Sequence, residues 1–244
     1  MRIKTILIIS IIALLVFLIY LTTLDKKVYY LSLGDSLAMG QTPYGNSDYG
    51  YTDYVRDYLI KKNVFEKHIN QFSEKGYRIS DLSRDIEDNK KIIIDDKPQT
   101  IKNALVKADL VTLSIGLNDL LYTIGINNTD KENMYEYIDE MMLDMDELFK
   151  LIKEYCKEDI MVLGYYVPTL YLSNEDVINY IRYTNNKLKT LCNNYNINFI
   201  EIDKIIENNT KYLPNPLDIH PSKMGYEVIS TEIIEKIEQT LLKK

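Results

Sequence analysis

Short apolar runs alternate with longer amphipathic segments along most of this chain. The apolar runs have the length of buried strands and lie at 28–33, 68–72, 108–115, 160–167 and 197–202. Segments with apolar residues at helical spacing lie at 51–61, 99–107, 131–155, 175–195 and 222–242. Strands that alternate with helices form a mostly parallel sheet that is covered on both faces. We therefore predict an α/β fold with five strands, and the stretch 88–97 fits either a loop or a short strand.

Residues 1–27 form a separate unit in front of a domain at 28–244. Arg2 and Lys4 precede a long apolar run, and a helix over 5–24 would be roughly 30 Å long, which matches the hydrocarbon core of a bilayer. This pattern predicts a single membrane anchor that holds the domain outside the cytoplasm, at the cell membrane. A cleaved signal peptide, which would leave the domain secreted, is the alternative, although residues 22–25 offer no small-x-small cleavage site. A buried core helix fits poorly because the run is apolar on every face.

Charge and composition exclude several classes of function. The formal net charge of −7 argues against nucleic acid as a partner, because phosphate binding needs a basic surface. The only imidazoles are those of His68 and His220, and no structural zinc site is indicated. Cys156 and Cys192 are the only cysteines, and they fit either a disulfide outside the cell or two buried thiols.

The first strand ends in Gly34-Asp35-Ser36. A serine on a tight turn after a buried strand exposes its hydroxyl beside backbone N–H groups, which suits a nucleophile. The alternative is an ordinary turn between strand and helix, where Asp and Ser are common caps. Gly76 follows the second strand and could offer its N–H to a substrate oxygen. Asn118 follows the third strand, and its side-chain amide is a neutral donor for an oxyanion.

A histidine lies in the last loop before the closing helix. His220 is flanked by Asp218 and Pro221, whereas we expect His68 to lie at a connection between helix and strand. The turns with Ser36, Gly76 and Asn118 follow successive strands, so together with the loop of His220 they should meet at one edge of the sheet. This is the arrangement of an acyl-transfer site.

Together these residues resemble the motifs of the SGNH or GDSL-type serine hydrolases, over 29–237. Gly34-Asp35-Ser36-Leu37 is similar to the nucleophile block of that family, Gly76 to its second-block glycine, Gly116-x-Asn118-Asp119 to its third block and His220-Pro221 to its last. The resemblance implies a flavodoxin-like three-layer α/β/α sandwich without metal or organic cofactor. It also implies Ser36 as the nucleophile and His220 as the general base. The oxyanion hole would comprise the N–H groups of Ser36 and Gly76 and the side chain of Asn118.

The spacing of the last block departs from the family pattern. The family has two residues between the acid and the histidine, whereas only Ile219 separates Asp218 from His220, and the expected position holds Leu217. If the loop bends differently, Asp218 could still orient the imidazole. Otherwise a backbone carbonyl would take that role and leave a Ser–His dyad.

These observations predict a membrane-anchored, outward-facing serine esterase. A lipid or lysophospholipid acyl ester fits the membrane anchor, and an O-acetylated cell-surface polysaccharide fits the outward location. Tyr44, Tyr49, Tyr51 and Tyr54 could line a sugar or acyl pocket, although they could equally pack the first helix. A non-catalytic glycan- or lipid-binding module on the same fold is a further alternative, which gives no reason for Ser36, Asn118 and His220 to occur together. The sequence carries no signal for an oligomeric state.

Overall fold

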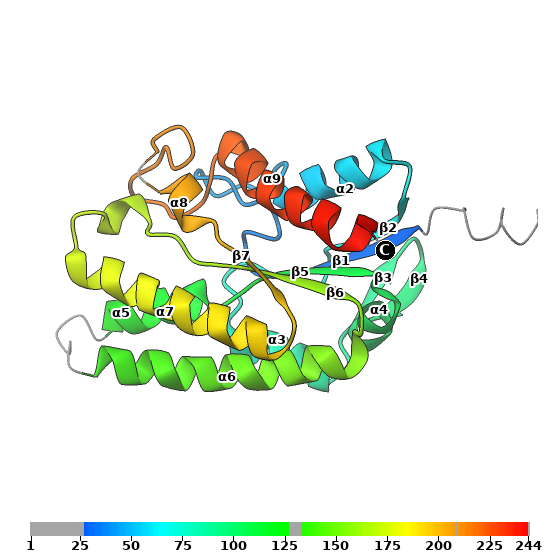
Figure 1. Cartoon of the computed structure of the whole chain (residues 1–244), viewed down its shortest axis with the longest axis horizontal. Coiled ribbons are helices and arrows are strands. Elements are labelled where there is room, and N and C mark those ends of the chain that lie inside the picture. Colours follow the sequence, from blue (N-terminus) through cyan, green and yellow to red (C-terminus); the bar gives the residue numbers. More distant parts are fainter. Residues whose placement is uncertain (1–26, 127–132, 208, 244) are drawn as a thin grey trace, which may run out of the picture.

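A computed structural model describes residues 27–126, 133–207 and 209–243, and it contains a five-stranded sheet in the order β2-β1-β5-β6-β7 (Figure 1). The neighbouring strands are all parallel. They are β1 (Val28–Gly34), β2 (Phe65–Ile69), β5 (Leu110–Ser114), β6 (Asp159–Leu163) and β7 (Asn198–Ile200). The chain moves outward from β1 to β2 and then returns to β5 on the other side of β1. This reversal opens a crevice at the carboxyl ends of β1 and β5, where doubly wound sheets bind ligands.

Helices cover both faces of the sheet, which gives the three layers that the family resemblance implied (Figure 1). One layer contains α2 (Tyr51–Lys61), the short α8 (Asp203–Ile206) and α9 (Lys223–Gln239). The other contains α3 (Ile79–Glu87), α4 (Ile101–Lys107), α5 (Leu117–Ile126), α6 (Met134–Tyr155) and α7 (Glu175–Asn194). Single 3₁₀ turns lie at Thr169–Tyr171 and Leu241–Lys243.

The central strands are mostly apolar because both of their faces are covered. Every residue of β1 and of β5 is buried, whereas the edge strand β2 is only partly buried. Two of the long helices begin at a residue whose side chain accepts a free N–H group of the first turn. The Ser222 hydroxyl accepts from the N–H of Gly225 at the start of α9, and the side chain of Asn174 accepts from Val177 at the start of α7.

The second strand and the stretch at 88–97 differ from the sequence expectation. β2 begins at Phe65, earlier than the expected 68–72, because the turn after α2 closes at Asn63 in the left-handed region (φ 58°) and the chain pairs with β1 directly. The second region forms an antiparallel hairpin of β3 (Lys91–Ile94) and β4 (Lys97–Thr100). Its two-residue turn, Asp95 and Asp96, has both φ angles positive, as in the turns that fit a hairpin's twist.

Three helices were not expected from the sequence: α3, α5 and the single turn of α8. The buried positions Ile79, Leu82 and Ile86 of α3 have helical spacing, but they follow the Gly76 turn so closely that the segment looks like loop. Similarly, α5 begins at Leu117, shortly after β5, where the Asn118-Asp119 pair suggests a turn.

The expected membrane anchor at 5–24 lies outside the described residues. None of the helices in the described ranges is long and apolar enough to cross a membrane. Cys156 and Cys192 are both buried and both free, which fits the interpretation as two buried thiols.

Candidate active site

Ser36 is held on a tight turn at the carboxyl end of β1. The strand ends at Gly34 (φ 133°), where a Cβ atom would collide with the carbonyl oxygen of Ser114 on β5, so only glycine fits. The chain then bonds to β5 through the N–H of Asp35, which donates to the Ser114 carbonyl at 2.9 Å. The carbonyl of Ser36 accepts from the N–H of Gln41 at 2.9 Å, which closes the turn. These bonds fix the Ser36 hydroxyl at the crevice between β1 and β5.

Asp35 braces this turn from below. Its side chain is buried, and Oδ1 accepts from the N–H of Leu37 at 3.0 Å and from the Ser114 hydroxyl at 3.1 Å. Burial raises the pKa of Asp35 to about 7, although both hydrogen bonds work against that rise. The side chain is therefore a structural support for the residue that follows it.

His220 connects the serine to a carboxylate. Its Nε2 lies 2.8 Å from Ser36 Oγ, and its Nδ1 lies 2.6 Å from Asp218 Oδ1. An imidazole that donates from Nδ1 to a carboxylate leaves Nε2 free to accept a proton from a hydroxyl. A hydroxyl, an imidazole and a carboxylate in this order can carry out base-assisted nucleophilic attack.

The short spacing between Asp218 and His220 is accommodated by a local turn. Asp218 Oδ1 accepts both the ring Nδ1–H and, at 2.7 Å, the backbone N–H of His220. The loop is held in place from two sides, since Tyr166 donates to the carbonyl of Ile219 at 2.5 Å and Asn215 Nδ2 donates to the carbonyl of Pro43 at 2.8 Å. The spacing left open whether the Asp218 side chain or a backbone carbonyl lies beside the imidazole. In the structure, the side chain of Asp218 lies beside Nδ1 of His220.

The surroundings of His220 keep its imidazole neutral. Burial is the largest influence and lowers the pKa of His220, the hydrogen bond and charge of Asp218 raise it, and the charge of Lys75 lowers it. The net direction is downward from 6.5. The ring is thus unprotonated at neutral pH, as a base must be.

The Gly76 turn and Asn118 lie against the same end of the sheet. The turn is tied to β1 because the N–H of Glu74 donates to the carbonyl of Gly34 at 3.1 Å. Gly76 is exposed, has a φ of 75° and meets no atom where a Cβ would lie, so its backbone is open to solvent. Asn118, in the first turn of α5, donates through Nδ2 to the carbonyl of Tyr77 at 2.9 Å. The structure therefore brings the predicted turns together around the crevice.

A second serine–histidine pair lies between β1 and β2, and it was not predicted from the sequence. His68 was expected at a connection between helix and strand, but this expectation is wrong because the residue belongs to β2. Its Nε2 lies 2.8 Å from the hydroxyl of Ser32 on β1, and its ring stacks on Tyr30 at 4.4 Å. Only the register of β1 against β2 could have indicated this contact, since it places Tyr30 opposite His68.

The four tyrosines near the first helix have separate roles. Tyr51 is fully buried, and Tyr49 packs edge to face against Tyr54 with ring centres 4.7 Å apart. Only Tyr44, whose side chain is 77 % exposed, presents its ring to solvent as a pocket residue would. Packing of the helix therefore accounts for most of this cluster.

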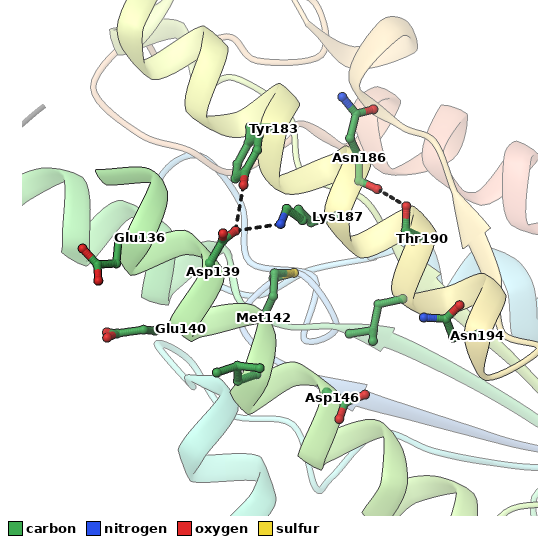
Figure 2. Close-up of a pocket in the computed structure, with 12 residues that line it drawn as sticks. Glu136, Asp139, Glu140, Met142, Asp146, Tyr183, Asn186, Lys187, Thr190 and Asn194 are labelled. Carbon is green, nitrogen blue, oxygen red and sulfur yellow. Dashed lines mark hydrogen bonds and ion pairs between the residues drawn. The ribbon is translucent and has the colours of Figure 1, made fainter. Parts of the chain in front are cut away.

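A groove of about 740 Å³ lies between α6 and α7, away from the candidate site, and none of the predicted site residues lines it. Figure 2 shows Tyr183 and Lys187 of α7 pointing toward Asp139 of α6, at 2.8 and 3.1 Å. The groove has carboxylates along one side but no serine–histidine pair. Among the described residues, no group of three or more His, Cys, Asp or Glu is placed to hold a metal ion.

Comparison with known proteins gives a family match and a shared fold. Residues 32–228 match the family described as GDSL-like Lipase/Acylhydrolase. By sequence, no curated protein matches this chain. The solved structure of the lipase Lip_vut3, from a goat rumen metagenome, has a TM-score of 0.69 at 22% identity, covering 84% of this chain and 95% of the lipase. Axe2, an acetylxylan esterase from Geobacillus stearothermophilus, has a TM-score of 0.61 at 18% identity, covering 87% of this chain and 95% of Axe2.

Proposed function

Since this chain belongs to the GDSL-like lipase/acylhydrolase family and is a serine hydrolase of ester bonds, we propose that it acts through an acyl-enzyme on Ser36. The observation that carries the proposal is the continuous chain of hydrogen bonds from Ser36 through His220 to Asp218. In this proposal Ser36 is the nucleophile, His220 is the general base and Asp218 is the acid that orients the imidazole.

The proposed reaction has two halves. Ser36 Oγ attacks the ester carbonyl carbon while His220 Nε2 takes its proton. The C–O bond to the alcohol then breaks, and the alcohol leaves with the proton from Nε2. In the second half, water gives a proton to His220 and attacks the acyl carbon, the acid is released, and Ser36 recovers its proton.

Developing negative charge on the carbonyl oxygen needs donors in a fixed place. We assign this role to the N–H groups of Ser36 and Gly76 and the side chain of Asn118, which lie on three turns at one edge of the sheet. The hydrogen bond from Asn118 to Tyr77 orients the amide before substrate arrives. Donors that are already oriented require no reorganisation during the reaction.

The proposed substrate is a lipid or lysophospholipid acyl ester. Two exposed apolar side chains support it: Leu217 is 81 % exposed on the His220 loop, and Tyr44 is 77 % exposed on the loop after Ser36. The hydrogen bond from Asn215 to Pro43 keeps these loops next to each other. Exposed apolar residues beside a reactive centre favour an apolar acyl group. The lipase with the same fold fits this choice.

A carbohydrate O-acetyl ester on a cell-surface polysaccharide is the second candidate. It is supported by the shared fold with Axe2, an acetylxylan esterase, and by the predicted outward location. An acetyl group needs no apolar surface for a chain, so chain-length preference separates the two candidates.

The proposed location is the cell membrane, with the catalytic domain outside the cytoplasm. The support is the apolar run at 5–24. The folded domain begins only a few residues later, because Lys27 already donates from Nζ to the carbonyl of Asn63 at 2.5 Å. Protease treatment of intact cells tests this location. Digestion of the domain in intact cells, together with recovery of the untreated enzyme in the membrane fraction, supports the proposed location. A domain that the protease cannot reach in intact cells contradicts it.

The test of function is a substrate panel with the full chain in detergent, with the Ser36→Ala variant as background. The panel contains p-nitrophenyl acetate, butyrate and dodecanoate, a lysophosphatidylcholine and acetylated xylan. We expect hydrolysis that depends on Ser36 and increases with acyl chain length. Preference for acetylated xylan would favour the second candidate. Wild-type hydrolysis no greater than that of Ser36→Ala would overturn the proposal.

A further inference from the structure

Two cations flank Gly76, and no carboxylate within the described ranges forms an ion pair with either of them. Lys75 donates from Nζ to the carbonyl of Gly45 at 2.8 Å. The guanidinium of Arg78 lies 3.7 Å from the centre of the Tyr122 ring, and Tyr122 is 51 % exposed. Both charges therefore rest on neutral groups at the surface.

The carboxylates of this segment form ion pairs with two other cations, Arg84 and Lys90. Glu74 and Asp85 both form ion pairs with Lys90, the second at 2.9 Å. Asp81 forms an ion pair with Arg84 at 2.6 Å. All three carboxylates between 74 and 85 are thus engaged elsewhere. In a chain with a net charge of −7, Lys75 and Arg78 thus carry positive charges that no ion pair in the described ranges neutralises.

The two cations lie on either side of Gly76, on a turn that is bonded to the end of β1 just before Ser36. Lys75 adjoins Glu74, whose N–H binds the carbonyl of Gly34 at 3.1 Å, and the charge of Lys75 contributes to the lowered pKa of His220. On the other side of Gly76, Arg78 stacks on Tyr122, which lies one helical turn after Asn118 on α5.

The carboxylate of Asp119 lies in the same region. The charge of Arg78 lowers the pKa of Asp119, yet burial dominates and raises that pKa to about 6. Asp119 Oδ2 accepts the N–H of Ile79 at 3.2 Å, so this carboxylate is committed to bracing the loop.

We propose that Lys75 and Arg78 select esters that carry an anionic group, a phosphate or a carboxylate, beside the scissile acyl group. This inference rests on the function proposed above and adds a charge requirement to it. The fork of a guanidinium binds phosphate and carboxylate oxygens in pairs, and stacking on Tyr122 holds that fork in one plane. The Lys75 ammonium supplies a second positive charge on the other side of Gly76. A lysophospholipid phosphate and the carboxylate of an acidic polysaccharide would both satisfy the two cations.

The test measures kcat/KM of the full chain on pairs of esters that differ only in charge. One pair is lysophosphatidic acid and the monoacylglycerol with the same acyl chain. The other is an acetylated oligogalacturonate and its methyl ester. We expect the wild type to prefer the anionic member of one pair, and the pair that shows the preference identifies phosphate or carboxylate as the source. Each of Lys75→Gln and Arg78→Gln should reduce the preference about fivefold, mainly through KM, and the double variant should abolish it.

Three controls separate selection from other roles of these cations. Lys75→Arg keeps the charge and should retain the preference. Lys107→Gln removes an exposed charge at the last residue of α4, near the amino end of β5, and should leave the preference unchanged. Thermal unfolding shows whether Arg78→Gln still folds. Equal kcat/KM for the members of both pairs in the wild type, or a preference that survives in the double variant, overturns the inference.

The same assay distinguishes this inference from the proposed function. Hydrolysis of p-nitrophenyl acetate that depends on Ser36, without any charge preference, contradicts only the inference. Absence of hydrolysis that depends on Ser36 contradicts the proposed function and the inference together.

Discussion

The protein contains two serine–histidine hydrogen bonds of the same length, in very different settings. Ser36 and His220 are 2.8 Å apart at the crevice of the sheet, and Ser32 and His68 are 2.8 Å apart between β1 and β2. Both serines come from one short stretch of chain. The two pairs share the same atoms and the same separation, so these features alone do not determine which pair can react.

The exposure of the serine and the group beside the imidazole distinguish the two serine–histidine pairs. Ser36 is 5 % exposed on a turn, whereas Ser32 is 0 % exposed within a strand. His220 has the carboxylate of Asp218 at 2.6 Å, while the ring of His68 is stacked on Tyr30. Burial and the charge of Arg56 lower the pKa of His68 to about 3, so this imidazole is a much weaker base than an ordinary histidine, whose pKa is near 6.5. Ser32 and His68, which we call the inner pair, therefore have the hydrogen-bond geometry of a catalytic dyad. They lack the carboxylate partner and the basic imidazole of the outer pair.

The largest expected difference lies between the two histidines. His220→Asn should lower kcat/KM for p-nitrophenyl acetate by about 10⁴-fold or more, because the base that activates Ser36 is lost. His68→Asn should lower the thermal unfolding midpoint and leave the turnover of the folded fraction within about threefold, since it touches no reacting group. An equal loss of turnover per folded molecule in both variants would remove the distinction between the pairs.

The carboxylate beside His220 should matter next. Asp218→Asn should reduce kcat by about 10²–10⁴-fold, because the imidazole loses its orienting acceptor and the stabilisation of its charged form. The Asp218 carboxylate raises the pKa of His220, so its loss should also move the acid limb of the kcat/KM profile to lower pH. A limb that stays in place would show that Asp218 does not act on the imidazole.

Asn118 has no counterpart at the inner pair. Asn118→Ala should lower kcat by about 10²–10³-fold with little change in KM, because in the proposed oxyanion hole the amide stabilises charge that exists only in the transition state. Steady-state kinetics on p-nitrophenyl butyrate measures this split. A rise in KM at constant kcat would instead place Asn118 in substrate binding.

The smallest expected effect is a dependence of stability on pH that comes from His68. The unfolded chain protonates this ring near 6.5, whereas the folded chain does so near 3, so the unfolded state binds more protons between these values. The contribution of His68 to stability is therefore full above pH 6.5 and is lost as the pH falls toward 3. Urea unfolding at several pH values should show a shallower slope in His68→Gln. An unchanged slope would show that His68 is not the titrating group.

Much of the geometry of the candidate site could be predicted from the sequence because its residues follow strand ends. Ser36, Gly76 and Asn118 lie in or after the connections that leave β1, β2 and β5, and parallel strands bring their carboxyl ends to one edge. The bend that places Asp218 against His220 could not be predicted, because it depends on a side chain accepting a backbone N–H two residues later.

The hydrogen bond between Ser32 and His68 could not be predicted from the sequence either. The contact between Ser32 and His68 depends on the register of β1 against β2, and register is a property of the assembled sheet. The β3-β4 hairpin remained ambiguous because its two-residue turn is Asp95-Asp96, which lacks the glycine that usually marks such turns.

The central claim is that Ser36, and not Ser32, is the activated serine. A fluorophosphonate probe reacts with an activated serine hydroxyl, and peptide mass spectrometry locates the adduct. Both serines fall on the tryptic peptide 28–56, so fragment spectra must distinguish them. We predict a single adduct on Ser36 in the wild type and in Ser32→Ala, and none in Ser36→Ala. An adduct on Ser32, or undiminished labelling of Ser36→Ala, would contradict the account.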